Sequence, residues 1–272
     1  MRQSIGGHPV EVDVLGDGLS VLLLHGFGAD RRRLLATVDP VFARRSGYRR
    51  IHVDLPGFGA SPSVPEIDSS VAMVDFVERL IDELIGDAPF LVVGESWGAY
   101  LGRGLTCRRP LQIIGAAFLV PVVIALQAER HVPEHRVLYE EPGVLDGVPE
   151  ATAAEIRAVG VVIDKPAWTH YRAAFLPPPA PDADAMARIR AGYTFPDDVN
   201  TRSDPFPHPT LIVAGRQDAT VGYRDAITVI EAFPRATFAV LDAAGHLLPG
   251  ERPSLLAALL DDWLDRVERS RD

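Results

Sequence analysis

The stretch Phe90-Leu91-Val92-Val93-Gly94-Glu95-Ser96-Trp97-Gly98 decides the fold of this 272-residue chain. Its first four residues are apolar and predict a buried strand, and the residues that follow Trp97 are compatible with a helix. A strand that passes through Gly-x-Ser-x-Gly directly into a helix makes a sharp turn, which strains the serine backbone and exposes its hydroxyl. Gly94 and Gly98 leave the room that such a turn needs. Ser96 is therefore the predicted nucleophile.

A serine hydroxyl is a weak nucleophile, so it needs a histidine as base and a carboxylate that orients the histidine. Both residue types follow later apolar runs: Asp218 follows the predicted strand 210–214, and His246 follows the predicted strand 237–241. Polar groups at the carboxyl ends of parallel strands collect at one edge of a sheet. The chain order Ser96, Asp218, His246 is also the order expected after such a turn. We predict that these three residues form a catalytic triad.

Two other carboxylates compete with Asp218 for the role of the acid. Asp242 ends the same strand that leads to His246, a position typical of a turn or capping residue. Asp225 lies inside the predicted helix 222–232, where we expect it to be solvated. Position and elimination therefore both favour Asp218.

An acyl-transfer nucleophile also requires N–H donors for the oxyanion of the tetrahedral intermediate. One donor is expected from the backbone of Trp97, the residue after the serine. The second is expected from Phe27, in the loop His25-Gly26-Phe27-Gly28 after the strand 19–24. We expect His25 to brace this loop by hydrogen bonds and to lie near the substrate. No Gly-Lys-Ser/Thr follows, so the loop does not bind phosphate as a P-loop does.

Short apolar runs alternate with longer amphipathic segments, which predicts a mostly parallel sheet with helices on both faces. The Asp54 to Ser61 segment reads as a tight Pro-Gly turn with a structural role. The predicted strands are an opening hairpin over 2–6 and 9–14, a central strand over 19–24, and strands over 50–54, 90–94, 113–119, 210–214 and 237–241. The predicted helices cover 30–44, 70–85, 97–107, 222–232 and 252–268.

The strand and helix rhythm breaks between Pro121 and Pro207, and Pro177-Pro178-Pro179 and Pro181 interrupt a helical stretch. A segment of this length between two sheet strands must carry structure of its own. We therefore predict a core over 1–120 and 208–272, and an inserted helical cap over 121–207. Trp168 and Tyr171 belong to the aromatic residues of this cap and are expected to contact the substrate.

The composition excludes several classes of function. The formal charge of −10 repels nucleic-acid phosphates and anionic lipid headgroups, so we expect a small-molecule substrate and neither nucleic acid nor membrane as partner. The first residues lack an apolar signal segment, and no run reaches the length of a membrane-spanning helix, which predicts a cytoplasmic protein. His131 and His135 are separated by Pro133, so no metal-ligand spacing is present. We expect neither a metal nor another cofactor.

Taken together, the motifs resemble those of the α/β-hydrolase superfamily over nearly the whole chain. They are the His25-Gly26 loop, the Asp54 to Ser61 turn, the serine turn, Gly215 to Asp218, and Gly245-His246. The resemblance implies an eight-stranded, mostly parallel sheet flanked by helices, with a helical cap after the sixth strand.

The expected activity is a cofactor-free, carboxylesterase-like hydrolysis through an acyl-enzyme, and the apolar cap favours a small or medium hydrophobic acyl group. Three alternatives stay open: a carbon–carbon hydrolase or lyase that uses Ser96 and His246 as base, a peptidase similar to proline iminopeptidases, and an inactive ligand-binding protein. Those peptidases carry His-Gly-Gly-Pro-Gly where this chain has His25-Gly26-Phe27-Gly28. Ser96 excludes haloalkane dehalogenases and epoxide hydrolases, because both use an aspartate there.

Overall fold

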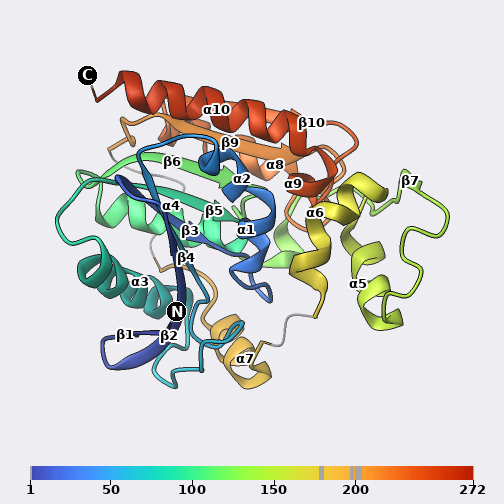
Figure 1. Cartoon of the computed structure of the whole chain (residues 1–272), viewed down its shortest axis with the longest axis horizontal. Helices are drawn as coiled ribbons and strands as arrows, with labels where there is room; N and C mark the ends of the chain where they lie inside the picture. Colours follow the sequence, from blue (N-terminus) through green and yellow to red (C-terminus); the bar gives the residue numbers. More distant parts are fainter. Residues whose placement is uncertain (1, 178–180, 197–198, 200–203, 272) are drawn as a thin grey trace.

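Eight strands form one central sheet in this computed structural model, which describes residues 2–177, 181–196, 199 and 204–271. The strand order is β1-β2-β4-β3-β5-β6-β9-β10 (Figure 1). β2 pairs antiparallel with β1 and β4, and the remaining neighbours are parallel, so the predicted sheet is confirmed. The strands are β1 Arg2–Ile5, β2 His8–Leu15, β3 Leu19–Leu24, β4 Tyr48–Val53, β5 Phe90–Glu95, β6 Ile113–Leu119, β9 Thr210–Gly215 and β10 Ala236–Leu241.

The central strands are buried on both faces, which explains their continuous apolar sequences. Every residue of β3, β5 and β9 is buried. In β2, near the edge, buried Val10 and Val12 alternate with more exposed residues. The reactive loops therefore extend from the most rigid part of the sheet.

Helices cover both faces of the sheet. Across the sheet, β4 lies on one side of β3, and β5 and β6 lie on the other side. Because crossovers between parallel strands are right-handed, α1 and α2, between β3 and β4, lie on one face, and α3 and α4 lie on the opposite face. In agreement, α10 packs on α2 and α3 packs on α4 (Figure 1). The helices of this layer structure are α1 Arg32–Thr37, α2 Asp39–Ala43, α3 Ser70–Leu84, α4 Trp97–Arg108, α8 Tyr223–Ile227, α9 Leu248–Glu251 and α10 Pro253–Arg269.

Two predicted helices are interrupted, whereas the helix predicted over 252–268 is present as α10, which Pro253 begins after the separate turn α9. The range 30–44 holds two short helices, because Pro40 lies in the first turn of α2 and cannot continue the ladder of α1. The range 222–232 holds α8 and a single 3-10 turn, Ile230–Ala232, separated by the β-branched residues Thr228 and Val229.

In the described part of the segment between β6 and β9 lie three helices, a separate pair of short parallel strands and a 3-10 turn at Gln127–Glu129. A second apolar cluster packs within it and against Leu247, with Ile156 and Tyr171 among its members. Figure 1 shows α7 apart from α5 and α6. The boundaries 121 and 207 remain a prediction, and Pro178 and Pro179 lie outside the described residues. These elements are β7 Tyr139–Glu140, α5 Glu150–Val159, β8 Val162–Ile163, α6 Lys165–Phe175 and α7 Ala183–Ala191.

Candidate active site

Ser96 occupies the strained turn between β5 and α4. Its backbone has φ 56° and ψ −114°, a region that non-glycine residues rarely adopt and that is typical of functional sites. A Cβ atom at Gly94 would lie 2.4 Å from the Gly98 carbonyl oxygen, and one at Gly98 would lie 2.0 Å from the Leu24 carbonyl oxygen. Neither position has room for a side chain, so both glycines are required by the close approach of backbone.

The three residues of the predicted triad lie in hydrogen-bond contact. His246 Nε2 is 3.0 Å from Ser96 Oγ, and His246 Nδ1 is 3.0 Å from Asp218 Oδ2. With the proton on Nδ1, the imidazole donates to Asp218 and accepts from the serine hydroxyl. Both distances fit proton transfer between the serine and a base held by a carboxylate.

Asp218 is held in its ionised form. Burial acts to raise the pKa of this carboxyl, but His246 and the backbone N–H groups of Val221 and Thr220 outweigh it and hold the pKa below its ordinary value of 3.8. The Thr220 and Val221 N–H groups donate to Oδ1 at 2.8 and 3.0 Å, which leaves Oδ2 for the histidine.

The competing carboxylates have other partners. Asp242 accepts a hydrogen bond from Gln217 Nε2 at 2.7 Å, in keeping with a turn position. Asp225 is buried and accepts from the backbone N–H of His131 at 2.9 Å, with the His131 ring 2.8 Å away. The expectation that Asp225 is solvated was wrong, because the segment after β6 that contains His131 covers it.

The loop after β3 lies directly against the serine. A Cβ atom at Gly26 would lie 3.2 Å from Ser96 Cβ. Within the part of the chain that the structure describes, the N–H groups of Phe27 and Trp97 donate no hydrogen bond. Both donors therefore remain available to a ligand, as the predicted oxyanion site requires.

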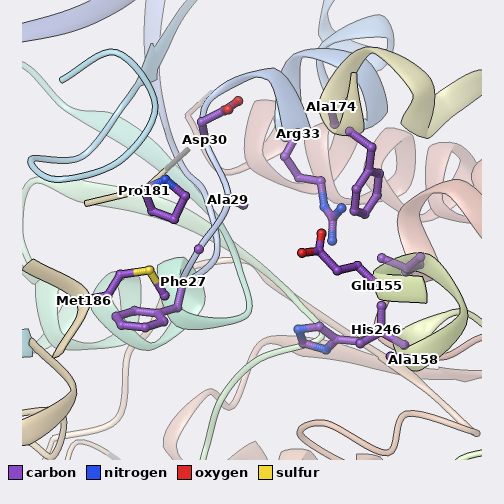
Figure 2. Close-up of a pocket in the computed structure, with 14 residues that line it drawn as sticks. Phe27, Ala29, Asp30, Arg33, Glu155, Ala158, Ala174, Pro181, Met186 and His246 are labelled. Carbon is purple, nitrogen blue, oxygen red and sulfur yellow. The ribbon is translucent and has the colours of Figure 1, made fainter. Parts of the chain in front are cut away.

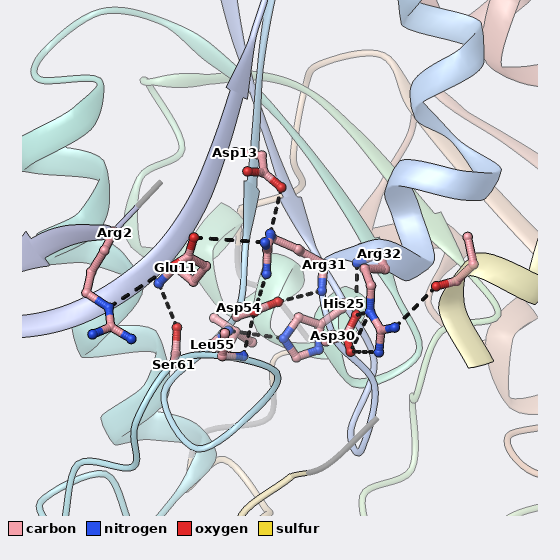
Figure 3. A network of polar contacts seen from close by, with 12 residues as sticks. Arg2, Glu11, Asp13, His25, Asp30, Arg31, Arg32, Asp54, Leu55 and Ser61 are labelled. Carbon is pink, nitrogen blue, oxygen red and sulfur yellow. Dashed lines mark hydrogen bonds and ion pairs between the residues drawn. The ribbon is translucent and has the colours of Figure 1, made fainter. Parts of the chain in front are cut away.

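His25 braces the loop and is not part of the lining of the two cavities described below, and its expected contact with the substrate stays a prediction. The ring is fully buried, and burial lowers its pKa, so that the neutral form dominates. Nδ1 donates to the Gly26 carbonyl at 2.8 Å, and Nε2 accepts from the Leu55 N–H at 3.1 Å. Both nitrogens are used inside the protein, and Figure 3 shows the contact with Leu55.

The turn that starts at Asp54 is fastened to the same loop. The Asp54 carboxylate accepts from the N–H groups of Arg31 and Ala60, each at 2.8 Å, and pairs with the Arg31 guanidinium (Figure 3). A Cβ atom at Gly59, where φ is 57°, would overlap this carboxylate. The structural role predicted for the turn therefore has a physical basis.

The two aromatic residues of the cap that were expected to bind substrate do not line the cavities. Tyr171 is buried, and its hydroxyl donates to the Leu247 carbonyl and accepts from the Gly250 N–H at 2.7 Å. Trp168 is partly buried against the second apolar cluster. The Tyr171 hydroxyl thus attaches α6 to α9.

Two cavities meet beside the triad and share Phe27, Val159 and His246 as lining. One, of about 490 Å³, contains Ser96. The other, of about 440 Å³, is mostly apolar and extends under the cap; Figure 2 shows Phe27 and Met186 facing His246 and Ala158 across it. A reacting carbonyl at Ser96 would thus have space on two sides.

Glu251 was not predicted and joins the histidine loop to the cap. Its Oε2 accepts from the Gly245 N–H at 2.6 Å, and its Oε1 accepts from the N–H groups of Val161 and Val162 at 2.6 and 3.2 Å. Burial raises the pKa of this carboxyl above 4.5. The sequence signal is slight: a lone acidic residue in the apolar turn after His246.

Over the described ranges, no group of three or more His, Cys, Asp and Glu side chains is arranged to hold a metal ion. None of the helices in those ranges is both long and apolar enough to cross a membrane.

The strand order, the strained serine turn and the Ser-His-Asp contact define an α/β hydrolase. The chain belongs to the alpha/beta hydrolase family, whose sequence model matches residues 21–259. The resemblance inferred from the motifs is thereby confirmed.

The chain is similar to two curated relatives and to one solved structure. A monoacylglycerol lipase of Xenopus laevis is 22% identical, with 93% of this chain and 77% of the lipase aligned. A pimeloyl-[acyl-carrier protein] methyl ester esterase of Shewanella oneidensis is 26% identical, with 96% and 97% aligned. The crystal structure of an alpha/beta superfamily hydrolase from Oenococcus oeni PSU-1 matches with a TM-score of 0.88 at 23% identity, over 95% of this chain and 96% of that one. That last likeness shows the fold.

Proposed function

We propose that the chain is a serine hydrolase that cleaves carboxylic esters through an acyl-enzyme. The observation that carries the proposal is the continuous contact from Ser96 through His246 to Asp218, at the junction of two cavities. Relatives named as a lipase and as a methyl ester esterase support an ester as the substrate.

Acylation starts when His246 Nε2 takes the proton of Ser96 and Oγ attacks the ester carbonyl carbon. The oxyanion then lies between the N–H groups of Phe27 and Trp97, each of which contributes about 3 kcal/mol to the transition state. The tetrahedral intermediate collapses, and His246 gives its proton to the departing alkoxide. Water repeats the sequence on the acyl-enzyme and releases the acid.

Asp218 keeps the imidazole in the tautomer that can accept the serine proton, and it stabilises the imidazolium. An Asp218→Asn side chain would present an amide N–H to Nδ1 and favour the wrong tautomer. We expect turnover to fall about 10⁴-fold. Near-normal turnover would reject Asp218 as the acid.

The apolar cavity supports a hydrophobic group on the substrate. Ala158, Phe175, Met186 and Leu247 line it, together with Phe27. Because Ser96, which keeps the acyl group in the acyl-enzyme, lines only the other cavity, the alcohol part of the ester fits here.

The proposal is tested with a fluorophosphonate probe and 4-nitrophenyl butyrate. Wild type should label and release nitrophenolate, and Ser96→Ala should do neither. Ser254→Ala, on the exposed side of α10, is the matched control and should behave as wild type. Full labelling of Ser96→Ala would overturn the nucleophile. Mass spectrometry after rapid acid quench should find the butyryl group on the peptide that contains Ser96; its absence during turnover would favour a general-base mechanism instead.

A further inference from the structure

The cavity that contains Ser96 carries positive charge that no carboxylate of its lining balances. This differs from the surrounding protein, whose formal charge is −10. Of the described residues that line it, Arg130 and Arg190 are cationic and none is an aspartate or glutamate. Ser96, Tyr193 and His246 share this lining.

Arg130 is fixed in place by neutral partners. Its guanidinium donates to the backbone carbonyls of Ile124, Ala125 and Thr220 at 2.8, 2.9 and 3.0 Å. Carbonyl oxygens orient the group but do not neutralise it, and among the described residues no carboxylate lies within ion-pair distance. The charge therefore stays available to the cavity.

Arg190, on α7, has its guanidinium carbon 5.4 Å from the centre of the Phe27 ring. Over the residues that the structure describes, it forms neither an ion pair nor a hydrogen bond. Its charge reaches the cavity: burial raises the pKa of Tyr193, and the charges of Arg130 and Arg190 both oppose that rise.

Arginines close to the same loops are paired. Arg33 contacts Glu95 at 2.9 Å, and Arg31 contacts Asp13 at 2.7 Å. Within the described ranges, Arg130 and Arg190 have no carboxylate partner and lie beside the nucleophile, which is the charge arrangement of an anion site.

We propose that Arg130 and Arg190 bind a carboxylate on the acyl part of the substrate, so that the preferred esters are monoesters of dicarboxylic acids. This rests on the proposed ester hydrolysis. Ser96 lines only the cavity with the arginines, and the acyl group is the part that stays bound to Ser96 in the acyl-enzyme. Guanidinium groups match carboxylates in geometry as well as charge.

The experiment compares two chromogenic esters of equal chain length, the mono-4-nitrophenyl ester of adipic acid and 4-nitrophenyl hexanoate. Arg190→Gln should lower kcat/KM about tenfold for the anionic ester, the value of one charge-assisted hydrogen bond, and less than about twofold for the neutral ester. Arg190→Lys should restore part of the loss.

Arg188→Gln is the matched control. Arg188 lies on the same helix outside both cavities, and the change alters net charge by the same amount. It should leave both esters within about twofold of wild type. Equal losses on both esters in Arg190→Gln, or the same selective loss in Arg188→Gln, would overturn the carboxylate site.

Calorimetric titration with adipate separates this proposal from the hydrolase itself, because it needs no turnover. Hydrolysis of both esters without dependence on Arg190 refutes the carboxylate site and leaves the esterase standing. If neither ester is cleaved, the titration decides: weaker adipate binding in Arg190→Gln than in wild type supports the site although the esterase fails. Equal or absent adipate binding refutes it.

Discussion

Replacement of Glu251 by glutamine tests whether this buried carboxylate holds the histidine loop against the cap. The wild-type oxygens accept three backbone hydrogen bonds, from Gly245 on one side and from Val161 and Val162 on the other. A glutamine side chain has one carbonyl oxygen, so in either orientation its NH₂ group faces a backbone N–H. At least one buried donor loses its acceptor.

An unsatisfied buried donor costs about 1–3 kcal/mol. A smaller effect opposes this loss, because burial raises the pKa of Glu251 and the wild-type carboxylate carries an unfavourable buried charge at neutral pH. We expect Glu251→Gln to lower the free energy of unfolding by about 1–2 kcal/mol at pH 7. An acid whose pKa is raised in the folded state stabilises the fold most at pH values below its ordinary pKa. This contribution is lost as pH rises through the pKa of the folded state. The stability gap between wild type and variant should therefore narrow as pH rises.

Urea unfolding at several pH values measures both the gap and its trend. Glu231→Gln, at an exposed glutamate in the 3-10 turn Ile230–Ala232, is the control and should change stability by less than about 0.5 kcal/mol. Because Gly245 precedes His246, kcat on a 4-nitrophenyl ester should fall more than KM changes. The reasoning is refuted by a variant as stable as wild type at pH 7, or by a gap that widens with rising pH.

Three further changes test other parts of the structure. Tyr171→Phe removes a hydroxyl that satisfies two backbone groups, so urea unfolding should show a loss of about 2 kcal/mol or more; an unchanged midpoint would contradict that. Gly98→Ala forces a Cβ to 2.0 Å from a backbone oxygen and should abolish fluorophosphonate labelling, whereas Gly102→Ala, whose Cβ meets side chains only, the nearest being the Phe118 ring at 3.1 Å, should retain it. Because the pKa of Asp218 is lowered in the folded protein, its carboxylate stabilises the fold above the ordinary pKa of 3.8, and this contribution is lost as pH falls through the folded pKa. Asp218→Asn should therefore weaken the fall of the free energy of unfolding at acid pH; an unchanged fall would reject this.

Much of the sheet was predictable, because strands buried on both faces carry continuous apolar runs, as in Leu19–Leu24 and Phe90–Glu95. The continuous helix predicted over 30–44 was wrong, since Pro40 begins a new helix. The apolar spacing continues across Pro40, but the helical hydrogen bonds cannot, because proline has no N–H.

The candidate site also has a part that the sequence predicts and a part that it does not. Ser96, Asp218 and His246 meet because each follows a strand at one edge of the sheet, which chain order reveals. Whether Tyr171 faces a cavity or a core depends on how α6 packs on α9, and no spacing encodes that. Glu251 and Arg130 were missed because their partners are backbone groups, which leave no residue pattern.

The contact between Ser96 and His246 joins residues 150 positions apart. During synthesis, the serine turn leaves the ribosome long before the strand that carries the histidine loop, and β9 must pair with β6 before β10 can add at the sheet edge. Until then the serine has no base and remains an ordinary alcohol. Reactivity of Ser96 toward a fluorophosphonate would therefore report that β9 and β10 have joined the sheet. A partly synthesised chain would not hydrolyse esters.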